Sequence, residues 1–419
     1  MKKIVTKPFD TAKIPPKQNL FFMPFIWLAC KFMTMSGRLK IEKVNMKGLK
    51  PPYLVLGTHH AFMDFYVTPL ALFPRRANYV SELEGFEAYG EWLYRQAGCL
   101  GTRKFITDID LVRNIKRVME RKGILVMYPE ARYANVGTSS EIPVSVSKLI
   151  KMLKVPVVVL NMQGNYLQSP IWNLTKRKGV PLRTKMNQLF TKEQVISLSV
   201  DEIHSMLSKE LSYDEYAWQK KENIKITFDE RAKGLHMPLY QCPVCKKEHQ
   251  MASEGIKLYC KECGASWEMD IYGRLAIKDE KTFKYTTDNV DFGHIPAWYE
   301  WQRSNVIEQI EKGEYLLDMK VRIEALPNAI NFIDCGEGRL KHEKEGFYLT
   351  FKDYGQDKKE TMFFSSKSLF SIHTEYDYRG KGQCITLSTS TNTYFIYPLE
   401  DGFNATKIQF AVEELYLRK

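Results

Sequence analysis

The chain has 419 residues, more than one compact core usually holds, so we expect two or more domains. Hydrophobic residues make up 44% and charged residues 26% of the sequence, close to globular averages, which excludes a largely disordered chain. The absence of a strict period or a biased tract excludes collagen-like, coiled-coil and low-complexity proteins. Lys and Arg number 61 against 49 Asp and Glu, a formal net charge of +12.

Much of the positive charge lies in the N-terminal segment. Residues 1–60 hold eleven basic and two acidic residues, a net charge of +9, which favours phospholipid or nucleic acid as a partner over a merely solvated terminus. Leu20–Met35 is mostly apolar but is interrupted by Pro24 and Lys31, and a bilayer span needs roughly 20 apolar residues. We therefore expect residues 1–36 to form an interfacial membrane anchor, with a core helix as the alternative.

Strand and helix patterns alternate after this segment. Short apolar runs predict buried strands at 53–57, 78–81, 124–128 and 155–160, and amphipathic patterns predict helices at 108–121 and 144–153. Strands that are apolar throughout and alternate with helices are typical of a mostly parallel sheet covered on both faces. The fold class expected for this part of the chain is therefore α/β.

Four of the eight cysteines form a cluster, Cys242, Cys245, Cys260 and Cys263, spaced as C-x2-C-x14-C-x2-C. This spacing predicts a zinc ribbon, and four thiolates would complete a closed, structural zinc site with no open position for catalysis. We expect no secretory signal and a reducing compartment, which favours zinc over disulfides. Nearby basic and acidic residues balance, so a nucleic-acid role is not favoured.

The C-terminal part of the chain has a different pattern. Residues 199–223 and 298–311 are predicted to be helical, and from about residue 319 short β-rich pieces follow one another between polar turns. A closing helix is expected at 405–417. Antiparallel strands followed by one helix resemble a pleckstrin-homology-like module, on shape alone.

A candidate catalytic pair follows the first predicted strand. His59 and Asp64 are spaced as H-x4-D at the carboxyl end of the strand at 53–57, where parallel α/β sheets bind ligands. The carboxylate can accept from one imidazole nitrogen and raise the basicity of the other. Three alternatives remain open for this motif: a capping Asp, a metal site, and a metal-dependent hydrolase that uses His59, His60 and Asp64.

The blocks that follow this motif resemble those of the glycerolipid acyltransferase superfamily, typified by 1-acylglycerol-3-phosphate acyltransferase. Its blocks are N-H-x4-D, G-x5-R, F-P-E-G-T-R and V-P-I-x-P, and the resemblance covers about residues 20–185 with block order intact. Three departures stand out: Thr58 precedes the histidine, Arg103 comes one position early after Gly98, and Glu130-Ala131-Arg132-Tyr133 replaces E-G-T-R. The phosphate contacts are therefore less well defined than the pair.

The resemblance implies acyl transfer by a general-base mechanism. His59 would deprotonate an acceptor hydroxyl and Asp64 would hold the imidazole, while the donor is a thioester, acyl-CoA or acyl carrier protein. Three basic residues, Arg103, Lys104 and Arg132, would grip the phosphate of a lysophospholipid acceptor, and Glu130 would orient Arg132 or a glycerol hydroxyl. The protein would be cytoplasmic and peripheral on the inner face of the cell membrane.

The expected organisation thus has five parts. They are the interfacial anchor (1–36), the acyltransferase domain (37–240), the zinc ribbon (241–275), a helical linker (276–318) and the β-rich domain with its C-terminal helix (319–419). A rival hypothesis is a non-enzymatic lipid- or nucleic-acid-binding protein built on a decayed acyltransferase core.

Overall fold

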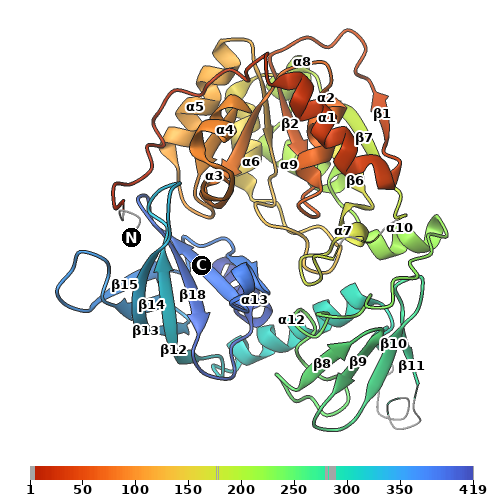
Figure 1. Cartoon of the computed structure of the whole chain (residues 1–419), viewed down its shortest axis with the longest axis vertical. Helices are drawn as coiled ribbons and strands as arrows, with labels where there is room; N and C mark the ends of the chain where they lie inside the picture. The colour runs from red at the N-terminus through yellow and green to blue at the C-terminus, as the bar shows by residue number, and fades with distance from the viewer. Residues whose placement is uncertain (1–4, 176, 178, 279–281, 283–288, 419) are drawn as a thin grey trace. The chain divides into compact units, whose positions relative to one another are not determined.

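The computed structural model describes residues 5–175, 177, 179–278, 282 and 289–418. The chain divides into two compact units (Figure 1). Unit 1 comprises residues 1–170, 176–218 and 327–331, and unit 2 comprises residues 171–175, 219–326 and 332–419.

Unit 1 is built on a seven-stranded mixed sheet in the order β1-β7-β6-β2-β5-β3-β4. Its strands are β1 (Lys40–Val44), β2 (Tyr53–Gly57), β3 (Asn78–Glu82), β4 (Cys99–Thr102), β5 (Ile124–Met127), β6 (Val157–Gln163) and β7 (Arg183–Phe190). The five strands from β6 to β4 run parallel, whereas β7 pairs antiparallel with β6 and parallel with β1. The expectation of a mostly parallel sheet in an α/β core is confirmed.

Helices connect these strands. They are α1 (Met23–Thr34), α2 (Asp64–Leu72), α3 (Leu83–Tyr89), α4 (Glu91–Gln96), α5 (Ile109–Glu120), α6 (Val144–Leu153), α7 (Asn165–Gln168), α8 (Lys192–Ser197), α9 (Val200–Glu210) and α10 (Glu215–Lys221). Asp108 caps α5 by accepting from the backbone N–H of Leu111, as its position before the apolar pattern predicts. The segment expected to be helical at 199–223 is two helices, because the chain turns at residues 211–214.

The core of unit 1 lies between the sheet and helices α5, α6 and α9. Leu54, Leu125 and Val157, from three adjacent parallel strands, pack with Ile115 of α5 and Ile203 of α9 in one buried cluster. Because the central strands are buried, their carboxyl ends have fixed positions and can present side chains rigidly.

Unit 2 begins with a four-stranded antiparallel sheet formed by β8 (Met251–Glu254), β9 (Lys257–Cys260), β10 (Ser266–Met269) and β11 (Leu275–Ile277). The helix α12 (Ile295–Glu311) follows it. Trp267 of β10 is buried against Trp298 of α12, with ring centroids 4.8 Å apart. This contact ties the small sheet to α12.

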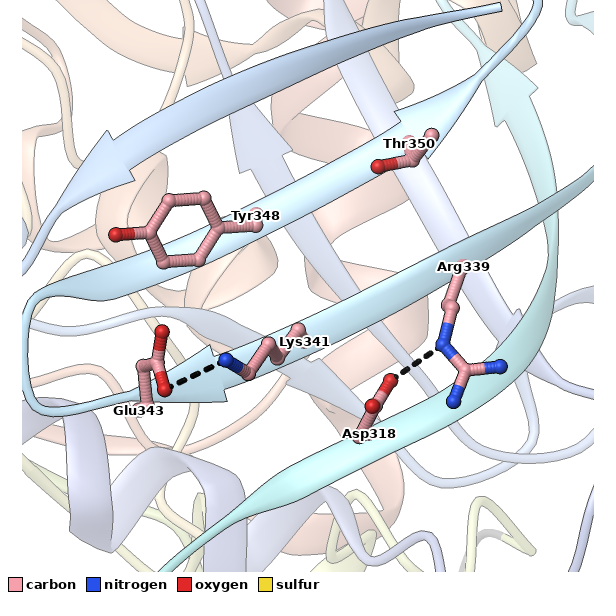
Figure 2. Close-up of a pocket in the computed structure, with 6 residues that line it drawn as sticks. All are labelled: Asp318, Arg339, Lys341, Glu343, Tyr348 and Thr350. Atoms are coloured by element: carbon pink, nitrogen blue, oxygen red, sulfur yellow. Dashed lines mark hydrogen bonds and ion pairs between the residues drawn. The ribbon is translucent and has the colours of Figure 1, made fainter.

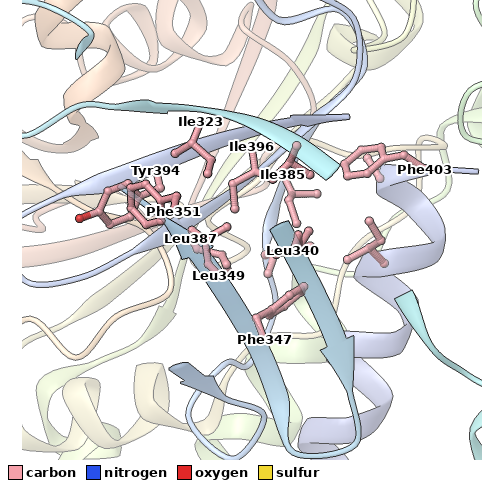
Figure 3. Close-up of a cluster of buried hydrophobic side chains, with 14 of the residues drawn as sticks. Ile323, Leu340, Phe347, Leu349, Phe351, Ile385, Leu387, Tyr394, Ile396 and Phe403 are labelled. Atoms are coloured by element: carbon pink, nitrogen blue, oxygen red, sulfur yellow. The ribbon is translucent and has the colours of Figure 1, made fainter. Parts of the chain in front are cut away.

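The rest of unit 2 is a seven-stranded antiparallel sheet in the order β15-β14-β13-β12-β18-β17-β16. Its strands are β12 (Leu317–Ala325), β13 (Ile333–Glu343), β14 (Gly346–Phe351), β15 (Glu360–Ser365), β16 (His373–Glu375), β17 (Cys384–Ser388) and β18 (Thr393–Pro398), and the helix α13 (Ala405–Leu417) closes the chain. Figure 3 shows Phe347, Ile385 and Ile396 from the sheet in one apolar cluster with Phe403, which precedes α13. The β-rich C-terminal domain is confirmed, and its likeness to a pleckstrin-homology module stays a prediction.

A cavity of about 280 Å³ lies on the exposed face of this sheet (Figure 2). Its charged side chains are paired with one another: Arg339 Nε donates to Asp318 at 2.6 Å, and Lys341 lies 2.8 Å from Glu343. The positive charges are already neutralised, so we assign this cavity no anion-binding role.

Helix α1 carries the apolar N-terminal sequence. Met23 and Cys30 are buried, while the opposite stripe leaves Phe25, Leu28 and Phe32 between 60% and 70% exposed. Across the described part of the chain, no helix has the length and apolarity that spanning a bilayer requires.

Candidate active site

The candidate pair lies where β2 ends. His59 Nδ1 is 3.1 Å from Asp64 Oδ2, and both side chains are almost completely buried. Helix α2 begins at Asp64, and the turn before it brings the carboxylate back to the backbone N–H groups of His60 and Ala61, which donate to Oδ2 at 2.7 and 3.1 Å. The residues of the H-x4-D motif therefore form a tight turn in which His59, His60 and Ala61 all contact one carboxylate oxygen of Asp64.

The other carboxylate oxygen of Asp64 is held from a neighbouring strand. The side-chain amide of Asn165, two residues beyond β6, donates to Oδ1 at 2.6 Å. Every neighbour of Asp64 is thus a donor, so the carboxylate acts as an acceptor and the proton on His59 belongs on Nδ1. This leaves Nε2 of His59 as the nitrogen able to accept a proton.

Aromatic rings surround His59. The imidazole stacks on Tyr128 with ring centroids 4.3 Å apart and an interplanar angle of 13°, and Tyr133 lies 4.5 Å away. Gly57 makes the stacking possible, because a Cβ at this position would lie 2.8 Å from the Tyr128 ring. The hydroxyl of Tyr128 in turn bonds Thr68 of α2 at 2.8 Å.

Glu130 binds the backbone of the loop that carries His59. Its Oε1 accepts the N–H of His59 at 3.1 Å, and its Oε2 accepts the N–H of Ser140 at 2.8 Å and the hydroxyl of Tyr213 at 3.2 Å. Burial raises the pKa of this carboxyl, and these hydrogen bonds together with the charge of Arg132 oppose the rise. Ala131, at the position where the family motif has Gly, adopts a left-handed conformation with φ of 54°.

The predicted phosphate-binding residues divide into two groups. Arg132 is buried two residues after Glu130, and its charge acts on the Glu130 carboxyl. Arg103 and Lys104 follow β4, which β5 and β3 separate from β2. Arg103 donates to the carbonyl of Pro327 at 2.7 Å, and Lys104 forms an ion pair with Glu82. The described contacts of Arg103 and Lys104 are therefore with the protein rather than with the pair.

Sequence reasoning missed Asn165, Tyr213 and Glu215. Asn165 follows β6, which is parallel to β2 and adjacent to it, so the rule that led to His59 also applies at this position. Tyr213 and Glu215 lie about 150 residues from the pair in the sequence, and no short motif marks them.

The four predicted cysteine ligands converge in unit 2. Their Sγ atoms all lie within 4.8 Å of one another, and the pairs Cys242–Cys263 and Cys245–Cys260 are each 3.7 Å apart. A tetrahedral zinc ion with Zn–S bonds of about 2.3 Å needs S–S separations of about 3.8 Å. Both C-x-x-C turns are followed by a left-handed residue, Lys246 and Gly264.

This geometry fits a metal ion held by four thiolates, with zinc the expected metal. Within the described chain, the four cysteines are the only group of three or more His, Cys, Asp or Glu side chains placed to hold a metal. His59, His60 and Asp64 do not form such a group, which removes the main support for a metal-dependent hydrolase.

Comparisons with known proteins complete the description. No protein-family model matches the chain, and no curated protein matches it. Among solved structures, the chain is similar to the 1-acyl-sn-glycerophosphate acyltransferase PlsC from Thermotoga maritima, with 14% identity, 46% of this chain and 78% of that chain covered, and a TM-score of 0.39. It is also similar to an inhibitor-bound Vav1, with 11% identity, 33% and 42% covered, and a TM-score of 0.15. At these TM-scores neither likeness decides the fold or the activity.

Proposed function

We propose that the chain is an acyltransferase that moves an acyl group from a thioester donor to the hydroxyl of a lysophospholipid. The observation that carries the proposal is the buried contact of His59 Nδ1 with Asp64 Oδ2 at the carboxyl end of a central parallel strand. The ordered motif blocks of the sequence point to the same reaction. A histidine oriented by a carboxylate, without a neighbouring serine nucleophile, suits a substrate that supplies its own hydroxyl.

The chemistry requires one base and no cofactor. Nε2 of His59 accepts the proton of the acceptor hydroxyl, and the hydroxyl oxygen attacks the thioester carbonyl carbon. The tetrahedral intermediate collapses with cleavage of the C–S bond, and the imidazolium returns the proton to the thiolate. Asp64 stabilises the transient positive charge on the ring, and the aromatic neighbours of His59, Tyr128 and Tyr133, keep water away from it.

We propose that Arg132 binds the acceptor phosphate. Its charge acts on Glu130, the residue that accepts the backbone N–H of His59, and a guanidinium can contact a phosphate through two parallel N–H donors. Arg103 and Lys104 are weaker candidates, because they follow β4, which β5 and β3 separate from β2.

We further propose that the protein acts at an anionic membrane surface. The exposed stripe of α1 presents Phe25, Leu28 and Phe32, with Lys31 on the same helix, which is a composition suited to the headgroup layer. The acceptor and the product both partition into bilayers, so a surface-bound enzyme meets its substrate there.

The proposal is tested by incubating purified protein with labelled acyl-CoA or acyl carrier protein and a panel of lysolipids. Transfer that depends on His59 is the expected result. If the wild-type protein transfers no acyl group to any acceptor but still binds lysolipid, the non-enzymatic rival on a decayed core replaces the proposal.

A further inference from the structure

A second buried histidine–carboxylate pair lies behind the proposed catalytic pair. The side chains of His60 and Glu215 are both fully buried, and His60 Nδ1 lies 3.7 Å from Glu215 Oε1. Within the described chain, three atoms of this pair have no hydrogen-bond partner: both ring nitrogens of His60 and Oε1 of Glu215. The other carboxyl oxygen of Glu215, Oε2, does have one. Buried polar groups normally have a hydrogen-bond partner, so two buried groups that face each other without one require a physical explanation.

Each member of this second pair is linked to a group that donates to Asp64. Glu215 Oε2 accepts the N–H of Gly164 at 2.8 Å, and the next residue, Asn165, donates its amide to Asp64 Oδ1. His60 donates its own backbone N–H to Asp64 Oδ2. The second pair therefore supports both oxygens of the carboxylate that orients His59.

The backbone at Gly164 can be occupied only by glycine. Its φ is 87°, and a Cβ at this position would lie 2.0 Å from the carbonyl oxygen of Pro181. The N–H of Gly164 is consequently fixed in direction, and Glu215 is the group that it meets. Removing this acceptor would release the loop that carries Asn165.

Burial favours the uncharged form of both groups. Burial raises the pKa of Glu215 to about 8, with the charges of Asp64 and Asp214 adding to the rise and the N–H groups of Gly164 and Leu167 opposing it. Burial lowers the pKa of His60 to about 4, which the charge of Asp64 opposes. The other titratable side chains that face Glu215 are Tyr213 and Tyr216, and burial raises the pKa of both.

We infer that Glu215 is protonated at neutral pH, that its O–H points at Nδ1 of His60, and that this neutral pair positions Asp64 for catalysis. The inference rests on the proposed function. A neutral Glu215 keeps a second negative charge away from Asp64, and the O–H donor occupies the acceptor nitrogen of His60. Ionisation of Glu215 would remove the donor and place two carboxylates in one buried region.

The protonation state can be measured without any activity. Infrared difference spectra at pH 7 should contain the C=O stretch of a protonated carboxylic acid, and Glu215→Gln should remove this band. Glu222→Gln is the matched control, because Glu222 is exposed and lies just beyond α10. A wild-type spectrum without the band, or a band that Glu215→Gln leaves unchanged in intensity, overturns the inference whether or not the protein is an acyltransferase.

The positioning role is tested by the pH profile of acyl transfer. Activity of the wild type should fall as pH rises through about 8, whereas Glu215→Gln, whose amide can still donate to His60 and accept from Gly164, should not lose activity there. At one pH unit above that value the variant should retain roughly tenfold more of its maximal activity than the wild type. Equal alkaline losses in both proteins would overturn the role. Absence of transfer in the wild type would instead refute the proposed function and leave the infrared result standing.

Discussion

The carboxylate of Glu130 accepts the backbone N–H of His59 at 3.1 Å. Glu130 follows β5 and His59 follows β2, so this bond joins the loops at the ends of two adjacent parallel strands. The resemblance to the acyltransferases implies a different role for Glu130, in which it orients Arg132 or a glycerol hydroxyl. The contact with His59 supports a positioning role in addition.

We expect Glu130→Ala to lower kcat/KM by roughly 10²-fold, because displacement of a catalytic base by about 1 Å has an effect of this size. The variant also leaves the buried N–H of His59 without its acceptor, which should cost about 1–3 kcal/mol of stability. Steady-state kinetics and thermal unfolding would measure the two effects. Glu141→Ala, at an exposed neighbouring position, is the control. Full activity of Glu130→Ala would contradict a positioning role.

Asp64→Asn should lower kcat roughly 10²–10⁴-fold with little change in acceptor binding. All the groups around the carboxylate are donors, so whichever way the Asn amide is oriented its NH₂ faces one of them. His59→Ala should abolish transfer without unfolding the protein. A dead His60→Ala combined with an active His59→Ala would show that the two histidines have been assigned the wrong roles.

The sequence predicted the parts of the fold that depend on local patterns. Helices α6 and α13 and strand β2 have the predicted bounds, because capping residues and apolar periodicity act within a few residues. The contact of His59 with Asp64 is equally local. Strand β7 buries Thr184, Met186 and Phe190 and pairs antiparallel with β6, and no motif in its sequence indicates this pairing. Asn165 reaches the site because β6 lies next to β2, and Glu215, on α10, reaches it through the N–H of Gly164. A single sequence contains neither the strand order nor this long-range contact.

The four-cysteine cluster should bind one equivalent of zinc. Removal of the metal by chelation, or the substitution Cys260→Ser, should destabilise the sheet of β8–β11. Either change should also alter the fluorescence of Trp267 and Trp298, which are buried against each other where this sheet contacts α12. Cys335→Ser is the matched control, since Cys335 lies outside the cluster. Elemental analysis of freshly purified, reduced protein would count the metal, and a protein without metal would remove the ribbon interpretation.

The raised pKa of Glu215 should make stability depend on pH. In the unfolded chain the group ionises near its ordinary value, about 4.3, whereas in the fold it retains its proton up to a pH of about 8. Between these values the folded state binds more protons, so stability should fall as pH rises, by up to roughly 5 kcal/mol. The thermal midpoint of Glu215→Gln minus that of the wild type should therefore increase from pH 5 to pH 8. A difference that is constant with pH would contradict a protonated Glu215.

The exposed stripe of α1 should bind anionic bilayers. Deletion of residues 1–36 would test this poorly, since Met23, Cys30 and Thr34 of the helix are buried and the truncation would expose the surface beneath them. Phe25→Glu and Phe32→Glu alter only side chains that are 60% and 69% exposed. Burying one Phe in the headgroup layer is worth about 1.5–3 kcal/mol, so each substitution should weaken binding to phosphatidylserine vesicles by tenfold or more.

The control for this experiment is Leu417→Glu, which introduces the same charge at a single apolar position that is 58% exposed in α13. Co-sedimentation with vesicles would measure binding, and assays on vesicle-borne and monomeric acceptor would separate binding from chemistry. The α1 variants should lose activity mainly on vesicles, because His59 and Asp64 are unchanged. Vesicle binding as strong in Phe25→Glu and Phe32→Glu as in the control would show that the stripe does not contact the membrane, and the basic residues of the N-terminal segment would then be insufficient evidence for an anchor.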